Sequence, residues 1–546
     1  MFFIFFAIEP SSQVNGNVTR RFWLNWTLIL GIVFTIYLIT MINAPIFHSD
    51  LFMNIDLGRI VLNPNTDWAI TWLTKLDKPV FLFNYLGIVS QEYIFQITGL
   101  FGPIVFTIIG ALIAATIMVK WLLIRNTPNH VAFILSFVFL LDPIFVQSYT
   151  VGRLDSWTIA LCLSVCLLLR DSIRYLQVNK SLRRSRLVLA GGITAVSFFT
   201  WPSAIFLLPL ILWELFYLSL EYKQICRGRK VPFLPIIIFG LGCLITVILL
   251  LIPVYELIYF QLNDILNILL INLQFGDINS EEAFYMGYFS SFIELFRALK
   301  YSPFIFLLAI VGFIKQKNSG IWIAFLISLS LMIFSVVYIH RVLYLLPYFI
   351  IGTSYLFRFK KDSTINRKDV LSPPIQTLAL IILIIWSSGL SIGAYTILSI
   401  EKMSDHETGR LYKAAETMGV SENHRVLIPN EFYFIGRSMG WKMYMPYTPI
   451  GVEKFSFKEM EPLLPHLDYA IINESKVTEE FSKQLAEEGM SNCGDFYIYE
   501  NRRLPFDGKT TNITRLRNLY KLFKQPYSPY TLFARETKKQ YSVLAN

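Results

Sequence analysis

The sequence predicts an all-α polytopic membrane bundle of about eleven transmembrane helices, followed by a small α/β domain. Hydrophobic residues make up 54% of the 546 residues and charged residues only 16%, and the mean hydropathy is +0.52. The charged residues gather in short connectors between apolar runs of about 18 residues or more, the length that a helix needs to cross ~30 Å of hydrocarbon. Beyond about residue 400 the hydrophobicity drops sharply, which marks a soluble region.

The net charge of +10 does not indicate a nucleic-acid partner. Most Lys and Arg residues lie in connectors that flank apolar segments, a placement typical of charges that orient a protein in a membrane. We therefore expect membrane lipids as partners and no nucleic acid.

The expected spans follow the apolar runs in chain order. They are Phe22–Asn43, Thr98–Val119, His130–Ser148, Trp157–Tyr175, Leu187–Thr200, Ser203–Leu220, Pro232–Leu257, Pro303–Ile314, Ile321–Tyr338, Val342–Phe357 and Ile375–Leu398.

The orientation follows from the Lys and Arg residues of successive connectors. With a cytoplasmic N-terminus, the connectors on the cytoplasmic side hold roughly three times as many of them as those on the other side. The sequence thus predicts a membrane module over residues 1–400, with outer loops 44–97 and 256–300. An odd number of spans leaves residues 401–546 on the non-cytoplasmic side.

Over residues 401–546, segments with a strand-like pattern of apolar residues and a segment with a helix-like pattern follow one another. This is typical of an α/β domain, here with a basic tail. Strands are expected at Arg425–Pro429, Leu467–Asn473 and Asp495–Glu500, with an amphipathic helix near Thr478–Glu488. After Arg502 the chain is basic and polar, and no regular structure is expected there.

The first outer loop supplies a candidate general base. Asp50 follows directly after the first span, so its carboxylate lies at the membrane boundary, within reach of a membrane-borne substrate. An ordinary hydrated loop acid is the plainer alternative. Four other acids compete for the same role: Asp56, Asp67, Asp77 and Glu92.

Candidate phosphate-binding cations occur in three outer connectors. Lys78 precedes Pro79 at the start of an apolar segment, where it either meets a lipid phosphate or snorkels to the interface. In the short connector before Trp157, Arg153 and Asp155 form either a functional pair or an interfacial Arg beside a helix-capping Asp.

A late outer turn adds His340, Arg341 and Tyr344. Such short motifs are individually uninformative. Their convergence on one membrane face favours a site there.

The order of these motifs resembles the GT-C superfamily of polytopic glycosyltransferases, and within it the protein O-mannosyltransferase and lipid A aminoarabinose transferase group. An acid after the first span is followed by Asp77-Lys78-Pro79, then by Gly-Arg153-Leu-Asp155, then by a basic-Tyr-Leu-Pro motif late in the bundle. The resemblance covers about residues 22–357. The remaining residues are compatible with the soluble domain that many members carry.

The resemblance implies a role for each matching residue. Asp50 would be the catalytic acid-base residue, and Lys78, Arg153 and Arg341 would bind the donor phosphate. Supporting residues would be Asp77, Asp155, His340 and Tyr344. The chain departs from the pattern where Leu51 follows Asp50 in place of a second acid, where Val80 follows Pro79, and where Trp201 replaces a lysine.

The implied reaction is transfer of a sugar from a polyprenyl-phosphate carrier to a lipid, glycan or protein acceptor at the non-cytoplasmic face, with inversion. A monophosphate leaving group held by cations has little need of a metal, and no cofactor is expected, although a divalent metal stays open. The run Asp405-His406-Glu407 either binds a metal or is a solvated linker.

Two rival functions remain open. A transporter or flippase of a lipid-linked glycan would use the same outer cations but would need charges along a path through the spans, where Asp142 and Glu214 are the main acids. A non-catalytic scaffold would leave the converging residues unexplained.

Overall fold

The computed structural model describes most of the bundle and the core of the C-terminal domain. The described residues are 20–43, 49–63, 84–225, 233–255, 292–316, 320–334, 339–357, 373–393, 396, 408–444, 464–473, 477, 479–496 and 530–535.

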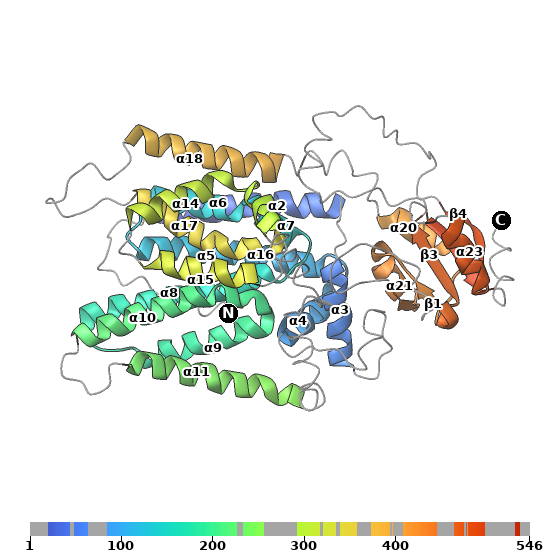
Figure 1. The fold of residues 1–546 in the computed structure, drawn as a ribbon, viewed down its shortest axis with the longest axis horizontal. Coiled ribbons are helices and arrows are strands. Elements are labelled where there is room, and N and C mark those ends of the chain that lie inside the picture. Colours follow the sequence, from blue (N-terminus) through green and yellow to red (C-terminus); the bar gives the residue numbers. More distant parts are fainter. Residues whose placement is uncertain are drawn as a thin grey trace, which may run out of the picture.

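A bundle of roughly aligned helices forms one end of the molecule, and a small sheet domain forms the other (Figure 1). The larger bundle helices are α2 (Arg20–Asn43), α5 (Gly102–Ile124), α8 (Asp155–Asn179), α9 (Arg184–Thr200), α10 (Leu208–Ile225), α11 (Leu234–Leu251), α14 (Pro303–Lys315), α15 (Ile321–Phe334) and α18 (Pro373–Ser388). Shorter pieces complete it: α6 (Asn129–Leu140), α7 (Pro143–Thr150), η2 (Pro202–Phe206), α16 (Ile339–Val342), η5 (Leu343–Leu345), α17 (Leu346–Ser354) and η6 (Tyr355–Phe357).

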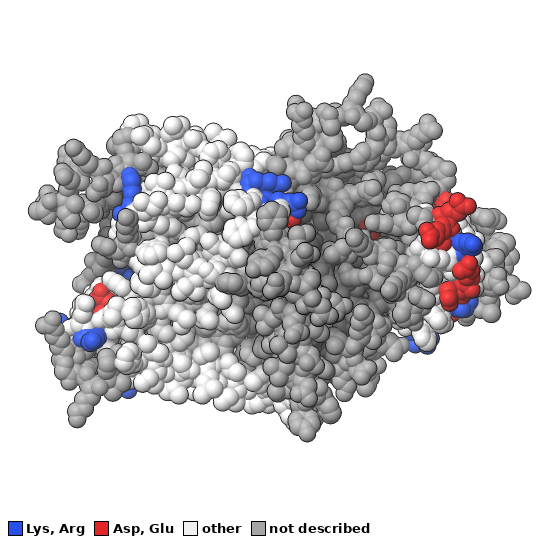
Figure 2. Space-filling view, in the orientation of Figure 1, with Lys and Arg blue, Asp and Glu red and all other residues white. Residues whose placement is uncertain are grey.

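The surface of the bundle is that of an integral membrane protein. Large apolar side chains on α11 such as Leu244 and Leu249 are more than half exposed, and Figure 2 shows a broad uncharged surface over the bundle with charges towards its ends. Among the described residues, 5 helices are long and apolar enough to cross a membrane, or up to 7 if each bent pair is one span. The expectation of about eleven spans therefore stays a prediction.

Two expected spans differ from the helices observed. The expected span His130–Ser148 is broken into α6 and α7, which meet at 54°. Pro143 begins the second piece, because a proline ring cannot continue the preceding helix. Asp142 caps the start of this second piece. The span expected at Thr98–Val119 lies a few residues later, in α5.

The first of the predicted outer loops contains two helices that sequence periodicity did not reveal. These are α3 (Ser49–Leu62) and α4 (Tyr85–Thr98). They lie between the bundle and the sheet domain, and α3 runs across the end of the bundle rather than along it (Figure 1). A β-carbon on Gly58 would lie 2.3 Å from the Ile88 carbonyl oxygen, so only glycine allows α3 to approach α4 this closely.

The C-terminal domain is built on a five-stranded sheet of order β2-β1-β3-β5-β4. Its strands are β1 (Arg425–Leu427), β2 (Lys442–Tyr444), β3 (Tyr469–Asn473), β4 (Met490–Phe496) and β5 (Tyr530–Arg535). β1 pairs in parallel with β2 and β3, whereas β5 is antiparallel to β3 and β4. Its helices are α20 (Thr408–Thr417), α21 (Tyr433–Ser438) and α23 (Glu479–Glu487), with short turns η10 (Asn430–Phe432) and η11 (Leu464–His466).

The two faces of this sheet bury different partners, as strand alternation requires. Ala470 and Phe533 pack with Leu485 of α23 in a small separate core. On the other face, Ile471 and Leu532 belong to the main apolar cluster, which continues into the helix bundle.

Two parts of this domain differ from what the sequence indicated. The strand expected at Asp495–Glu500 is β4, which begins at Met490 and contains a bulge between Asn492 and Gly494. The region after Arg502, where no regular structure was expected, contains β5 between β3 and β4. Pairing with two neighbours, not local composition, makes that segment a strand.

Candidate functional site

The short turn between α7 and α8 gathers the first group of candidate residues. Gly152 within it has φ +80°, a left-handed conformation that glycine adopts without strain. A β-carbon there would also lie 2.6 Å from Leu51 Cδ1. The tight turn presents Arg153 and Asp155 together.

Asp155 is fully buried and accepts three hydrogen bonds. Arg153 Nε and Ser148 Oγ each donate to Oδ2 at 2.8 Å, and the Tyr344 hydroxyl donates to Oδ1 at 2.7 Å. As the first residue of α8, Asp155 also lies at the positive end of the helix dipole. Burial of this charge is therefore well compensated, and the carboxylate holds Arg153 in place.

Aromatic side chains enclose this pair. The guanidinium carbon of Arg153 lies 5.8 Å from the ring centroid of Trp201, a distance at which the ring attracts the cation. The Tyr344 ring contacts Phe206, with centroids 6.0 Å apart. Trp201, which departs from the family pattern, thus contacts the candidate phosphate-binding arginine.

The start of α3 lies against the same turn. Leu51 packs on Gly152, as the glycine geometry above shows. Asp50 is the residue before Leu51, in the first turn of α3, and its side chain lies outside the described part. The backbone that carries Asp50 and the turn that carries Arg153 are therefore neighbours.

Helix α4 contributes a contact that the sequence did not predict. The Gln91 amide nitrogen donates to the Gly152 carbonyl at 2.5 Å, and Gln91 is fully buried. No local signal marks this glutamine, because the contact joins residues 61 positions apart.

The remaining candidates are only partly described. Asp67, Asp77 and Lys78 lie outside the described residues, as does the run 405–407. His340 and Arg341 belong to α16, which contacts α7; the Arg341 side chain is partly exposed. The roles expected for all of these residues stay predictions.

Two of the competing acids bind the C-terminal domain instead. Asp56 accepts a hydrogen bond from the Tyr433 hydroxyl at 2.9 Å, and Glu92 binds both terminal nitrogens of Arg437, at 2.7 and 2.5 Å. Burial raises the pKa of the Asp56 carboxyl above its ordinary value, although Arg59 opposes the shift.

The two main acids within the expected spans have structural partners. Asp142 accepts from the backbone N–H groups of Ile144 and Phe145, at 3.0 and 3.4 Å, and from the Ser302 hydroxyl. Glu214 forms ion pairs with Arg125 and Arg170. Each acid joins separate parts of the bundle.

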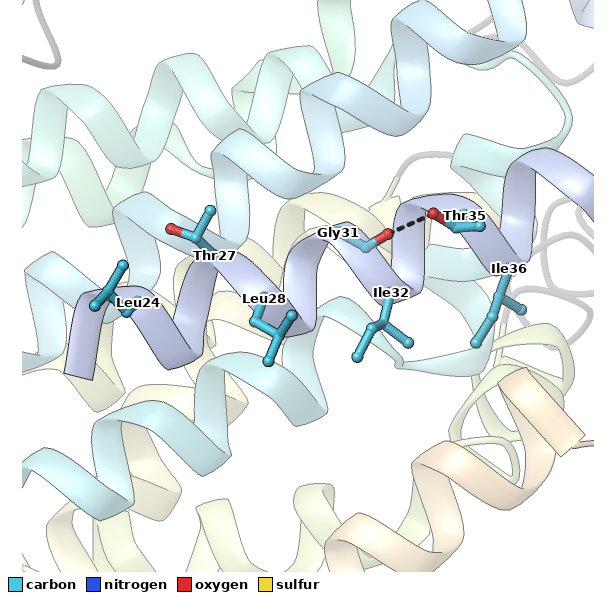
Figure 3. Close-up of a pocket in the computed structure, with 7 residues that line it drawn as sticks. All are labelled: Leu24, Thr27, Leu28, Gly31, Ile32, Thr35 and Ile36. Carbon is cyan, nitrogen blue, oxygen red and sulfur yellow. Dashed lines mark hydrogen bonds between the residues drawn. The ribbon is translucent and has the colours of Figure 1, made fainter. Parts of the chain in front are cut away.

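An open groove runs along the outer side of α2 (Figure 3). Its lining is apolar apart from Thr27 and Thr35, and the Thr35 hydroxyl donates to the Gly31 carbonyl of the same helix at 2.9 Å. The groove contains no titratable side chain and has no means of acid–base or phosphate chemistry.

The described residues form no cluster of three or more His, Cys, Asp or Glu side chains able to hold a metal ion. The one carboxylate of the turn, Asp155, already receives three donors. This turn does not fit a divalent metal that takes carboxylate ligands.

Comparison with known proteins identifies the fold. No family model and no curated protein matches the chain. The structure is similar to apo ArnT from Cupriavidus metallidurans, with a TM-score of 0.54 and 10% identity over 93% of this chain and 98% of that one. ArnT bound to undecaprenyl phosphate gives a TM-score of 0.51 at 9% identity, with the same coverage of both chains.

An Archaeoglobus fulgidus oligosaccharyltransferase tethered to an acceptor peptide gives a lower TM-score, 0.43, at 12% identity over 83% of this chain and 69% of that one. The ArnT comparisons show an ArnT-like fold, which agrees with the fold that the resemblance of the sequence implied.

Proposed function

We propose that this protein is a membrane glycosyltransferase that moves a sugar from a polyprenyl-phosphate carrier to a glycan, lipid or protein acceptor at the non-cytoplasmic face. One observation carries the proposal. The helix that begins Ser49-Asp50 packs, through Leu51, on the turn that presents Arg153. An acid and a cation about a hundred residues apart are thus brought to one end of the bundle, as such a transfer requires. The ArnT fold, seen elsewhere with undecaprenyl phosphate, supports the choice of carrier.

The proposed chemistry is a single inverting displacement. Asp50 takes the proton of the acceptor hydroxyl. At the same time, the hydroxyl oxygen of the acceptor bonds to the anomeric carbon, on the side opposite the phosphate. The bond between that carbon and the phosphate oxygen breaks, and the carrier leaves as a phosphate dianion. Arg153, with Lys78 and Arg341, stabilises that charge where little water is present.

Asp155 and Tyr344 have a supporting role in this scheme. Asp155 is buried and already accepts three hydrogen bonds, so it is poorly suited to receive the acceptor's proton. Its bond to Arg153 Nε instead fixes the plane of the guanidinium. A planar donor fixed in this way suits a phosphate, which is bound with defined geometry.

Transport of a lipid-linked glycan is the alternative. A transporter would need polar groups along a path through the spans. Asp142 and Glu214, the main acids that the sequence offers there, are engaged in capping a helix and in pairing two arginines. These contacts favour the enzyme.

The test is sugar transfer by purified protein from a panel of radiolabelled polyprenyl-phosphate sugars. Replacing Asp50 with Asn keeps the size of the side chain but removes the base, so transfer should fall by ~10²–10⁴-fold with normal expression. Glu480→Gln, which changes an exposed acid on α23, is the matched control.

Normal transfer by Asp50→Asn would exclude Asp50 as the base. If the wild-type protein transfers no sugar from any donor but moves the lipid-linked sugar across a bilayer, the enzyme assignment is wrong.

A further inference from the structure

Helix α3 makes contacts on two of its faces. Leu51 and Gly58 contact the α7–α8 turn and α4, whereas Phe52 and Asp56 contact Tyr433 of the C-terminal domain. Residues spaced by about one or two turns share a helix face, so each pair defines one side of α3. The helix is held between the bundle and the domain (Figure 1).

The contact of α3 with the domain is fully buried. Tyr433 and Asp56 are both 0% exposed, the Tyr433 ring lies 5.5 Å from that of Phe52, and its hydroxyl donates to Asp56 Oδ1. Arg59 donates to the same oxygen at 3.1 Å. A buried hydrogen bond between a domain and a helix fixes position as well as contact, because either group would lose its partner if they shifted.

A second contact joins the domain to α4. Arg437 forms a two-pronged ion pair with Glu92, which is 0% exposed, and the Gln96 amide donates to the same carboxylate at 2.7 Å. The Arg437 guanidinium lies 4.6 Å from the Phe95 ring centroid. The ring centroids of Phe95 and Phe434 are 5.3 Å apart. Bidentate pairing gives this contact a defined geometry.

The same segment of α4 reaches the candidate site. Glu92, which Arg437 binds, directly follows Gln91, which donates to the Gly152 carbonyl. Gly152 in turn precedes Arg153. A chain of direct contacts therefore runs from α21 through two adjacent residues of α4 to the turn that presents the arginine.

We propose that Tyr433 and Arg437 are positioning residues for the glycosyl transfer site: by docking on α3 and α4, they hold the helix start that carries Asp50 and the turn that carries Arg153. The inference rests on the proposed function. It assigns the C-terminal domain a part in the geometry of the reaction, beyond the acceptor contacts or stability that we expect of it from the sequence. A small displacement of a catalytic group is enough to slow a reaction markedly.

The test uses the full-length protein in lipid nanodiscs, with Arg437→Ala and Tyr433→Phe as variants. Tyr433→Phe removes one hydroxyl and keeps the ring, so it reports on the contact even if Arg437→Ala folds poorly. Arg437→Lys is the conservative variant, and Lys483→Ala removes an exposed cation from α23 of the same domain as the control.

Two measurements separate positioning from plain stability. With saturating donor, kcat of Arg437→Ala should fall by ~10-fold or more while KM for the donor stays within about three-fold, and Arg437→Lys should recover part of the loss. Amide hydrogen exchange over residues 49–62 should become ~10-fold faster in Arg437→Ala and faster by a smaller factor in Tyr433→Phe. Lys483→Ala should match the wild type in both.

Unchanged exchange over residues 49–62 in both variants would overturn the inference, and so would faster exchange with an unchanged kcat. Either result leaves the proposed function intact. A wild-type protein that transfers no sugar from any donor would instead overturn the proposed function, and the role of Tyr433 and Arg437 with it.

Discussion

Helix α8 takes part in two buried ionic clusters, one at its first residue and one further along, and the clusters are built differently. At the first residue of α8, Asp155 binds Arg153 of the adjoining turn, Ser148 of α7 and Tyr344. About 22 Å along the helix, Arg170 shares Glu214 with Arg125. Arg125 also bonds the Tyr355 hydroxyl at 3.1 Å.

The surroundings of the clusters differ too. The Asp155 cluster lies beside α3 and α4, which connect the bundle to the C-terminal domain. The Glu214 cluster joins α5, α8, α10 and η6 of the bundle to one another. Buried charge is therefore no sign of function by itself. What distinguishes the first cluster is its position next to α3 and α4, where the proposed substrate would meet it.

The comparison is tested most strongly by Glu214→Gln. This change leaves Arg125 and Arg170 buried without their counter-ion, and loss of one partner of a buried pair costs about 3–5 kcal/mol. We expect a much lower thermal midpoint in detergent but a normal rate of sugar transfer per folded molecule at low temperature. A stable variant that has lost transfer would assign this cluster to the chemistry and erase the distinction.

Exchanging arginine for lysine at each cluster tests the same contrast with one chemical change. Arg153→Lys keeps the charge but loses the planar donor set, so transfer should fall by ~10–100-fold. Arg170→Lys should leave transfer within about two-fold, because Arg170 pairs with Glu214 inside the bundle, away from the turn that presents Arg153. Steady-state rates with the active donor measure both, and equal losses would contradict the comparison.

Tyr344→Phe should have a smaller effect. It removes one of the three donors to the Asp155 carboxylate, and a hydrogen bond to a charged group contributes about 1.5–3 kcal/mol. We expect a modest loss of thermal stability together with a several-fold lower kcat, because Arg153 becomes less firmly held. An unchanged kcat would limit Tyr344 to a structural part.

The smallest expected effect is a pH dependence at the junction with the C-terminal domain. Burial raises the pKa of Asp56, which faces Arg59, Tyr433 and Arg437. The folded state therefore binds the proton more tightly than the unfolded state. The stability from this group is present below the ordinary aspartate pKa and is lost as pH rises through the raised one.

Asp56→Asn removes this titration and keeps an oxygen that accepts from Tyr433. Thermal midpoints of wild type and variant should therefore diverge by about 1–2 °C as pH rises through that range, with the variant the less pH-dependent. If the thermal midpoints of wild type and variant instead change in parallel with pH across this range, Asp56 stays ionised at the junction.

Local sequence features were sufficient for part of this structure. Apolar length predicted helices such as α2, α5 and α11. A contact between Arg153 and Asp155 was one of two alternatives that their short spacing left open, and the structure contains it. The alternation that predicted β1 and β3 likewise acts within single strands. Each of these features is a property of neighbouring residues.

The partners across long sequence separations came from the tertiary structure alone. Tyr344 meets Asp155 across 189 positions, Arg437 meets Glu92 across 345, and Tyr433 meets Asp56 across 377. Two acids that competed with Asp50 as candidate bases thus contact residues of the C-terminal domain. Periodicity and spacing describe which face of an element is apolar, but which polar groups meet depends on how the elements pack, and no single segment contains that information.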